Sequence, residues 1–265
     1  MLISLRLGDL VSTTALPSLN GRQLGQIVLP LPPLAEQRAI AAALSDVDAA
    51  LAGLEQLIAK KRDLKQAAMQ QLLTGKTRLP GYSGAWEVKA LEDVCSMKSG
   101  EQITIARIDG HSEYPCYGGN GLRGFTSKFT HEGEFCLIGR QGALCGNVVD
   151  VTGKFFASEH AVVVAPHFET DVRWLSMVLA RMSLNQYSES SAQPGLSVGK
   201  LLILKVLIPP SKAEQTAIAA VLSDTDSELA ALTGQAEKTR LLKQAMMQEL
   251  LTGRIRLPIA ENADG

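Results

Sequence analysis

The sequence predicts an α+β fold in which a strand-rich middle domain is flanked by two long helical regions that pair with each other. The first observation is a duplication: residues 36–80 and 214–258 align without a gap at a constant offset of 178, with 28 of 45 positions identical. The second is that every aromatic residue, cysteine and histidine lies between Tyr82 and Tyr187. The third is that the repeats are rich in Ala, Leu, Gln, Lys and Glu and contain no internal proline, as helices do.

Each repeat carries signals for the start and the end of a helix. In the second repeat Ser211 precedes Glu214 by three residues, which is a capping-box pattern. Both repeats end at Thr-Gly, where glycine can adopt the left-handed conformation that terminates a helix. The short polar residues at 45–48 and 223–226 compete for backbone hydrogen bonds. We therefore expect a break at these positions, with a short helix followed by a long one.

The apolar residues of the first repeat follow the 3-4 spacing of a coiled-coil seam. A long helix with one apolar stripe needs a partner, and the duplicated helix carries a matching stripe. The residues expected to make this contact are Leu51, Leu54 and Ile58 in the first repeat and Leu229, Leu232 and Ala236 in the second.

Composition indicates an ordinary water-soluble protein with one or two domains, 46% hydrophobic and 20% charged over 265 residues. No apolar run approaches the roughly 18 residues of a membrane span, and the start lacks the pattern of a signal peptide. We therefore expect a cytoplasmic protein with no membrane partner. The net charge of −1 gives no support for a nucleic-acid partner. Residues 81–207 hold 11 Lys and Arg against 13 Asp and Glu, so folding would have to create any positive face.

The cysteines and histidines do not have the spacing of a metal site. The four cysteines form no C-x-x-C pair, and the histidines form no ligand pair with them. Buried reduced thiols are the favoured interpretation, and we expect neither a metal nor a cofactor.

The middle domain alternates strand-like runs with glycine-rich turns, and a helical run at 171–184 interrupts them. The strand-like runs are residues 135–138, 147–151, 161–165 and 201–208. A G-x-G-x-x-G pattern from Gly119 to Gly124 is followed by a strand-like run rather than a helix, which excludes a dinucleotide site. The stretch Gly195–Lys200 is one residue short of a phosphate-binding loop and lacks its Ser or Thr.

Two turns carry side chains that suit DNA bases. The first presents Asn120 and Arg123, and the second, Gly139–Gly142, presents Arg140 and Gln141 after a predicted strand. Arg, Asn and Gln make bidentate contacts with guanine and adenine edges, although hairpin turns with surface polar residues remain an alternative.

Three further features have simpler interpretations. Ser158, Glu159 and His160 could form an acid–base pair, but a structural hydrogen-bond cluster is favoured because no nucleophile or metal partner accompanies them. Trp86 and Trp174 are interpreted as core anchors.

These motifs together resemble the specificity subunit of type I restriction–modification systems. The similarity lies in the Pro-Pro-x-Glu-Gln-type starts (Pro32 to Gln37, Pro209 to Gln215), the Thr-Gly helix ends and the duplication. In the middle domain, Tyr117 to Gly121 and Ile138 to Gly146 are similar to that family's target-recognition domain.

The resemblance implies two target-recognition domains separated by two conserved helical regions that form an antiparallel coiled coil. Each recognition domain would read half of a bipartite double-stranded DNA site, and the helices would dock the modification (methyltransferase) subunits of a complex that includes a restriction subunit. Candidate DNA-binding residues are Tyr117, Asn120, Arg123, Lys128, Arg140 and Gln141. No catalytic residue is expected, because methyltransferase and nuclease signatures are absent from the sequence.

By this resemblance the chain divides into five segments. They are the tail of a first recognition domain (1–33), the first helical region (34–80), a complete recognition domain (81–207), the second helical region (208–258) and a disordered tail (259–265). Four alternatives stay open: a scaffold or oligomerisation module that does not bind DNA, a non-functional fragment, a small DNA-modifying enzyme, and a homodimer that reads a palindromic pair of half-sites. The sequence does not reveal the DNA target.

Overall fold

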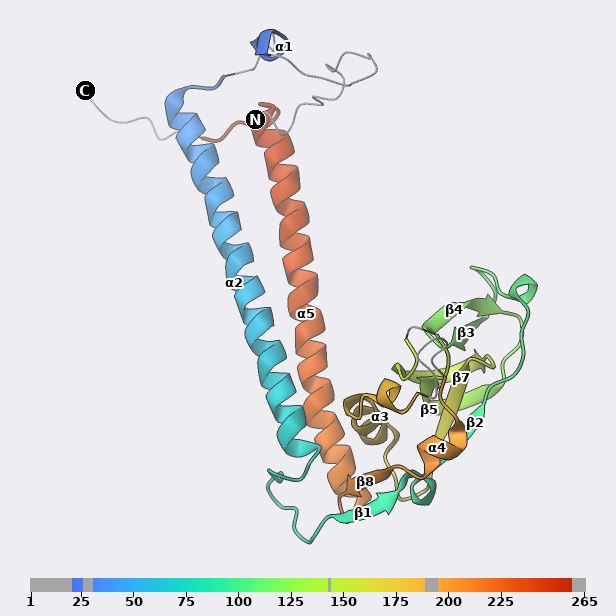
Figure 1. The fold of residues 1–265 in the computed structure, drawn as a ribbon. Coiled ribbons are helices and arrows are strands. Elements are labelled where there is room, and N and C mark those ends of the chain that lie inside the picture. The colour runs from blue at the N-terminus through green and yellow to red at the C-terminus, as the bar shows by residue number, and fades with distance from the viewer. Residues whose placement is uncertain (1–20, 26–30, 143, 189–194, 259–265) are drawn as a thin grey trace. The chain divides into compact units, whose positions relative to one another are not determined.

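The computed structural model describes residues 21–25, 31–142, 144–188 and 195–258 (Figure 1). The expected tail of a first recognition domain at 1–33 and the expected disordered tail at 259–265 fall largely or wholly outside these residues. The chain divides into two units, which are considered separately: Met1–Asp63 with Asp226–Gly265, and Leu64–Thr225. Among the described residues, no helix is both long and apolar enough to cross a membrane.

Two long helices, α2 (Leu34–Leu72) and α5 (Lys212–Leu251), correspond to the two repeats. The expected break at the polar residues is wrong, because both helices are continuous. The polar side chains do not displace the hydrogen bonds of the helix backbone. The Thr225 hydroxyl donates to the Val221 carbonyl (3.0 Å), and Asp48 forms an ion pair with Lys243. The strong helix formers on either side then carry the helix through.

In the first unit, α2 and α5 run antiparallel to each other, and ion pairs fix their register (Figure 1). The pairs are Lys61–Glu228, Glu55–Arg240, Asp48–Lys243 and Glu36–Arg256. From Lys61 back to Glu36 along α2, the residue paired with each lies progressively later in the sequence, from Glu228 to Arg256. This order is the one that antiparallel pairing requires. The first three pairs are exposed or partly exposed, and such pairs contribute at most about 1 kcal/mol each, whereas the Glu36 carboxylate is buried. The apolar seam between them, which includes Leu51, Ile58 and Ala236, is buried.

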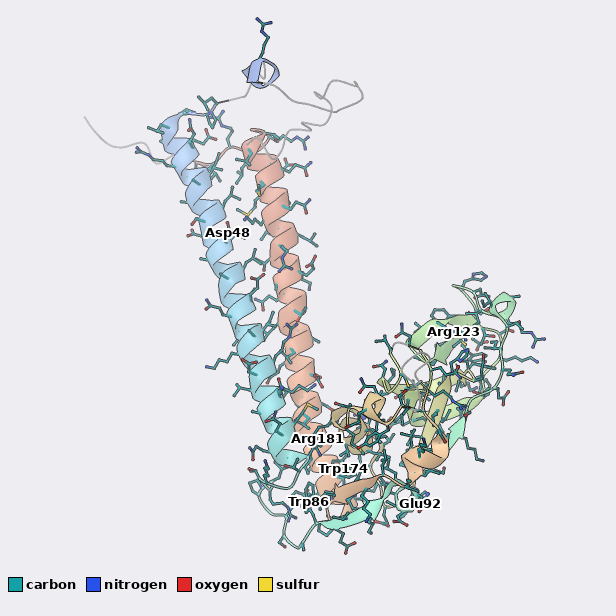
Figure 2. All side chains as sticks on the ribbon, viewed as in Figure 1. Asp48, Trp86, Glu92, Arg123, Trp174 and Arg181 are labelled. Carbon is teal, nitrogen blue, oxygen red and sulfur yellow. The ribbon has the colours of Figure 1, made fainter. Side chains whose placement is uncertain are left out.

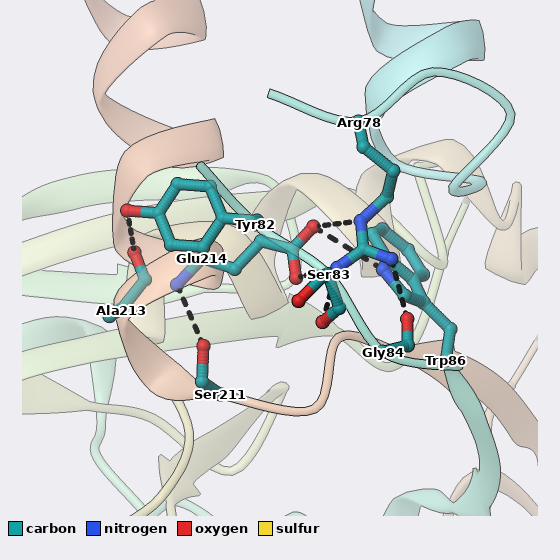
Figure 3. A network of polar contacts seen from close by, with 8 residues as sticks. All are labelled: Arg78, Tyr82, Ser83, Gly84, Trp86, Ser211, Ala213 and Glu214. Atoms are coloured by element: carbon teal, nitrogen blue, oxygen red, sulfur yellow. Dashed lines mark hydrogen bonds and ion pairs between the residues drawn. The ribbon is translucent and has the colours of Figure 1, made fainter. Parts of the chain in front are cut away.

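The helix ends follow the sequence signals closely. Gly75 and Gly253 adopt positive φ angles of 67° and 73°, so the expected left-handed glycines are confirmed. At the start of α5, the Glu214 backbone N–H donates to the Ser211 hydroxyl (3.3 Å). The Glu214 side chain does not return to the cap but binds Arg78 (Figure 3), so only half of the capping box forms.

The second unit contains a six-stranded sheet and a two-stranded sheet. The six strands lie in the order β2 (Cys95–Ser99), β7 (Ala161–Pro166), β5 (His131–Gly139), β6 (Val148–Ala157), β3 (Tyr114–Gly118), β4 (Gly121–Thr126). Neighbours are antiparallel except for the β3–β6 pair. The small sheet pairs β1 (Glu87–Ala90) with β8 (Lys205–Ile208) where the chain enters and leaves the domain.

The sequence predicted three of the strand runs and the helix. Residues 135–138, 147–151 and 161–165 fall within β5, β6 and β7, with residue 147 just before β6. Helix α3 (Val172–Arg181) begins after Asp171, whose carboxylate accepts a hydrogen bond from the Trp174 backbone N–H (2.9 Å). The strand expected at 201–208 is wrong in its first half. The end of helix α4 (Val198–Leu202) covers residues 201 and 202, and β8 starts only at Lys205. The Leu201 N–H bonds to the Ser197 carbonyl, and the Leu201 side chain is buried in the core.

The core of the second unit lies between the sheet and α3. Val162 and Val164 face the cluster that contains Trp174, whereas Val163 faces a smaller cluster around Phe155, as alternation along a strand requires. Trp174 is fully buried, which confirms its role as an anchor. All four cysteines are unpaired and buried, as expected, and burial raises the pKa of Cys95 to about 12.

Candidate nucleic-acid interface

The two glycine turns singled out in the sequence lie against each other. Gly119 is in the hairpin between β3 and β4, and Gly139 ends β5. A Cβ atom on Gly139 would lie 2.0 Å from the Gly119 carbonyl oxygen, so a side chain is excluded there. A Cβ on Gly119 would in turn lie 2.9 Å from the Gln141 carbonyl oxygen. We call this assembly the double-turn cluster; its members are Gly118–Arg123, Gly139–Gln141 and Ser158–His160.

The hairpin position also explains the G-x-G-x-x-G pattern. Gly121 and Gly124 have positive φ angles of 86° and 144°, and β4 starts at Gly121. The pattern therefore forms a strand turn, which agrees with the exclusion of a dinucleotide site.

Arg140 is held at the edge of the cluster by backbone and side-chain bonds. Its backbone N–H donates to the His160 carbonyl (2.9 Å), and its carbonyl accepts from Leu196 (2.8 Å). One terminal guanidinium nitrogen donates to the Ser99 hydroxyl (2.7 Å). The Arg140 Nε is buried and bonds to no described residue. The guanidinium is thus fixed through one terminal nitrogen and has its Nε buried, which leaves the other terminal nitrogen as the group for which no hydrogen bond to a described residue is found.

Gln141 is positioned by a relay of side chains from the next turn. Its amide oxygen lies 2.7 Å from His160 Nδ1, and the other ring nitrogen lies 3.2 Å from a Glu159 oxygen. Glu159 accepts a hydrogen bond from the Ile103 backbone N–H (3.3 Å). The interpretation of this turn as a structural hydrogen-bond cluster is confirmed for Glu159 and His160, whereas the Ser158 hydroxyl is buried and bonds to no described residue. Sequence reasoning missed that the group it orients is Gln141.

Asn120 and Arg123 lie on the hairpin side of the cluster, and both are exposed. A Cβ on Gly118 would lie 2.4 Å from Arg123 Cδ and 3.3 Å from the Ser158 hydroxyl, so the arginine side chain lies along this glycine. Figure 2 shows Arg123 on the part of the second unit remote from Trp174 and α3.

The side chains of the two other candidate residues have different surroundings, although the Tyr117 carbonyl accepts a hydrogen bond from the Ser158 N–H of the cluster (2.8 Å). Tyr117 is half-buried and packs edge-on against Phe155, with ring centroids 6.0 Å apart, so it serves the core. Lys128 is exposed in the connection between β4 and β5 and makes no hydrogen bond or ion pair with a described residue. The structure therefore brings together four of the six candidates, Asn120, Arg123, Arg140 and Gln141.

The cluster offers hydrogen-bond donors and acceptors rather than a reactive group. Two guanidinium groups and two amides can make paired contacts with base edges. Within the described part of the chain, no three His, Cys, Asp or Glu residues are close enough together to bind a metal.

The candidate helix contacts lie between α2 and α5 with graded burial. Leu51 and Ile58 are buried, whereas Leu54, Leu229 and Leu232 are half-buried. Leu57, which also lies on α2, is exposed, so the apolar stripe of α2 does not extend to this residue.

Comparison with known proteins identifies the family. A family model described as the type I restriction modification DNA specificity domain matches residues 1–62 and 84–241. The chain belongs to this family. An Escherichia coli protein, the type I restriction enzyme EcoprrI specificity subunit, is 47% identical over 143 residues, which are 52% of this chain and 35% of that protein. A putative type I restriction enzyme specificity subunit of Haemophilus influenzae is 29% identical over 163 residues, or 59% of this chain and 40% of the relative.

Solved structures of specificity subunits share the fold. The type I restriction–modification S subunit of M. genitalium superimposes with a TM-score of 0.67 at 20% identity, over 92% of this chain and 68% of that one. The HsdS subunit of Thermoanaerobacter tengcongensis gives a TM-score of 0.53 at 18% identity, over 96% and 70%. The matched regions thus span about two fifths or less of the curated relatives and about two thirds of the solved chains.

Proposed function

We propose that this chain is a sequence-specific DNA-binding subunit of a type I restriction–modification complex. In this proposal the second unit reads one half of a bipartite DNA site, and the paired helices dock modification subunits. The observation that supports DNA reading best is the double-turn cluster. In this cluster Gly119 and Gly139 lie so close together that a side chain on Gly139 is excluded, and the two turns present side chains that suit DNA bases. Family membership supports the assignment to a restriction–modification complex.

Direct readout of bases is the chemistry that the cluster fits. Arginine pairs with the O6 and N7 atoms of guanine, and asparagine or glutamine pairs with the N6 and N7 atoms of adenine. Gln141 is oriented by His160, and Arg140 by Ser99, so less side-chain freedom is lost on binding. Arg123 and Asn120 on the opposing turn are exposed and add a second pair of reading groups.

Catalysis is assigned to the other subunits of the complex. The Glu159–His160 pair is occupied in positioning Gln141, and no nucleophile accompanies it among the described residues. Phosphate neutralisation is assigned to the modification subunits as well, because this chain has a net charge of −1. The proposed partners are therefore double-stranded DNA, modification subunits and a restriction subunit, in the cytoplasm.

Methylome sequencing tests this proposal directly. Cells that express this chain as the sole specificity subunit, with a modification subunit, should methylate one discrete motif. Cells with the modification subunit alone are the control and should show none. A symmetric interrupted motif indicates that two copies of the chain act together, and a single half-motif indicates one copy. The absence of any motif, with the complex assembled, contradicts the proposal.

The net negative charge favours one other candidate, a scaffold that assembles subunits without reading DNA. The sequence preference of DNA binding by the assembled complex separates the two. A DNA-reading chain gives the complex a preference for one sequence through base contacts, whereas phosphate contacts made by the modification subunits carry no such preference. A complex with this chain that binds DNA no more tightly than the modification subunit alone would establish the scaffold.

A further inference from the structure

The imidazole ring of His160 lies between two oxygen atoms. Its Nδ1 atom is 2.7 Å from the amide oxygen of Gln141, and its Nε2 atom is 3.2 Å from a carboxylate oxygen of Glu159. An ionised carboxylate and an amide oxygen only accept hydrogen bonds. Both ring nitrogens must therefore carry a proton, so this arrangement is that of the positively charged imidazolium.

A neutral ring cannot keep the same arrangement, because it has a single N–H. If Nδ1 carried that proton, the lone pair of Nε2 would face the Glu159 carboxylate, and the two would repel each other. The proton of the neutral ring therefore stays on Nε2, and Nδ1 becomes an acceptor. The amide oxygen of Gln141 then faces a lone pair, and the hydrogen bond is lost unless the amide turns.

A half-turn of the Gln141 amide restores this hydrogen bond. The turn exchanges the oxygen and the NH2 group, and the last torsion of a glutamine side chain has a broad, roughly two-fold energy profile. Gln141 is exposed, and its side chain makes no other hydrogen bond to a described residue. The close contact between Gly119 and Gly139 holds the main chain of this turn in place while the side chain turns.

The two orientations of the amide present different groups to a base. With the imidazolium, the amide oxygen is bound to the ring, so the free NH2 group offers donors only. With the neutral ring, the NH2 group donates to Nδ1, and the free edge offers the oxygen as an acceptor and the second N–H as a donor. In the major groove guanine presents two acceptors, N7 and O6, whereas adenine presents the N7 acceptor and the N6 amino donor.

We propose that the Glu159–His160 pair is a proton-dependent selector that determines which purine Gln141 reads. The neutral ring selects adenine, and the imidazolium selects guanine. His160 acts through Gln141 rather than on the base itself, so it is a positioning residue. The inference rests on the proposed function, because it requires Gln141 to contact a base pair, and it adds a dependence of specificity on pH.

The other charged side chains around His160 are glutamates and arginines from its own turn and from three neighbouring segments. They are Glu159, Glu101, which bridges to Ser158, Arg123, which acts with Glu159 on the Cys116 thiol, and Arg140, whose backbone N–H bonds to the His160 carbonyl. Burial raises the pKa of Cys116, so this thiol stays neutral. Among these residue types, histidine is the one that ordinarily changes charge between about pH 5 and 8. A base preference that changes across this range therefore reports on His160.

Proton linkage gives the selector a second consequence. Where the ring of the free complex is mostly neutral, binding to a guanine site takes up a proton that binding to an adenine site does not. DNA phosphates near the ring favour the imidazolium with both kinds of DNA. The difference in proton uptake between the two sites is therefore the informative quantity.

Competition binding with the assembled methyltransferase tests the selector. The labelled probe is a duplex with the methylated motif, and the competitors carry an adenine–thymine or a guanine–cytosine pair at the position that Gln141→Ala relaxes. The ratio of the adenine-site affinity to the guanine-site affinity should rise by at least about fivefold from about pH 6 to about pH 8. The position that Arg140→Ala relaxes is the internal control, because a guanidinium stays charged and its base preference should not change with pH.

Three substitutions separate the selector from general effects of pH. His160→Gln cannot titrate, so the affinity ratio should become independent of pH. Glu159→Gln removes the charge that stabilises the imidazolium, so the rise in the ratio should occur at a pH lower by roughly one unit. His111→Gln is the matched control, because His111 is an exposed histidine beside Asp109, and its loss should leave the pH profile unchanged.

The outcomes distinguish the selector from the proposed function. An affinity ratio that does not change with pH, in a complex whose other base preferences are intact, overturns the selector and leaves the proposed function standing. A pH dependence that persists in His160→Gln, or that is equal at the Arg140 position, also overturns the selector. Equal proton uptake with both duplexes, measured by calorimetry in buffers of different ionisation enthalpy, does the same. If His160→Gln abolishes DNA binding, an unshifted Glu159→Gln profile overturns the selector. The loss of every base preference in the unmodified complex contradicts the proposed function, and the selector with it.

Discussion

Glu36, 1% exposed near the start of α2, forms a two-bonded ion pair with Arg256, which lies just beyond the end of α5. The same pair recurs one repeat away as Glu214 and Arg78. The start of each long helix thus has the same Glu–Arg ion pair, although only Glu214 also accepts a hydrogen bond from Trp86. A buried carboxylate of this kind ties each helix start to the segment that follows the other helix.

Removing Glu214 should destabilise the second unit. The Glu214→Ala substitution leaves the Arg78 guanidinium and Trp86 Nε1 without their buried acceptor, and the free energy of unfolding should fall by about 3 kcal/mol. Urea denaturation followed by tryptophan fluorescence measures this change. Glu237→Ala is the control: Glu237 is an exposed partner of Arg240, so its loss should cost less than about 0.5 kcal/mol. Equal effects of both substitutions would contradict the structural role of Glu214.

The Glu36–Arg256 ion pair should make the start of α2 and the end of α5 less stable in acid. The hydrogen bond from Arg256 lowers the pKa of Glu36 below its ordinary value of 4.5. Because the folded pKa is the lower one, the pair stabilises the folded state above the unfolded pKa, and this contribution is lost as the pH falls through the folded pKa. The protection factors of the amides at residues 36–40 and 250–256, which correct for the intrinsic pH dependence of exchange, should therefore fall below about pH 4. In Glu36→Gln these protection factors should be lower at neutral pH and nearly independent of pH between about 3 and 6. A fall with acid in Glu36→Gln equal to that of the unmodified chain would refute the assignment.

The contact between the two turns should be intolerant of any side chain. Gly139→Ala places a methyl group 2.0 Å from the Gly119 carbonyl, so the hairpin must move away from Arg140 and Gln141. We expect a loss of about 1–3 kcal/mol in stability and a relaxed methylation motif. Gly110→Ala is the matched control, since its added Cβ would meet no atom within 4 Å and its φ is not positive.

Periodicity and local signals were sufficient for the parts of this fold that depend on neighbouring residues. The duplication predicted α2 and α5, and the Thr-Gly ends predicted the positive φ at Gly75 and Gly253. The break at Asp46 and Asp48 was wrong, because an ion pair across the helices is invisible in one helix's sequence. The end of α4 was mistaken for strand because an apolar run such as Leu201–Ile208 fits either structure.

Of the candidate site, only the two glycine-rich turns and their polar side chains were predicted from the sequence. The two glycine turns are visible in the sequence, and the structure brings them together through Gly119 and Gly139. Ser99 contacts Arg140 across 41 positions of sequence, and His160 contacts Gln141 across 19 positions. No spacing rule reveals contacts of this kind. The identity of Leu44 and Arg256 with Leu222 and Arg78 across the repeat was visible in the sequence, but the greater exposure of Leu44 and Arg256 is seen only in the structure.

Base reading by the cluster should be separable residue by residue. Arg140→Ala should cost about 1–3 kcal/mol in binding and relax selectivity at one base position, without reducing the salt dependence. Gln141→Ala should relax a different position. His160→Phe removes the bond that orients Gln141 and should reproduce part of the Gln141 effect. Methylome sequencing of the assembled methyltransferase measures all three. Lys205→Ala, an exposed lysine on β8, is the control and should leave the motif unchanged; unchanged selectivity in every variant would exclude the cluster as the reading site.

The pairing of α2 with α5 should be required for assembly with modification subunits. Leu51 is buried and Leu54 half-buried against the partner helix, so Asp at both positions places two charges in an apolar seam. We expect loss of helix pairing in the first unit and loss of partner docking in co-purification, with the tryptophan fluorescence of the second unit preserved. Leu57→Asp is the matched control, because Leu57 is 41% exposed on the same helix and should tolerate the charge. If the Leu51→Asp, Leu54→Asp chain assembled as well as the Leu57→Asp chain, docking would not depend on the paired helices, and the recognition domain would have to supply that surface.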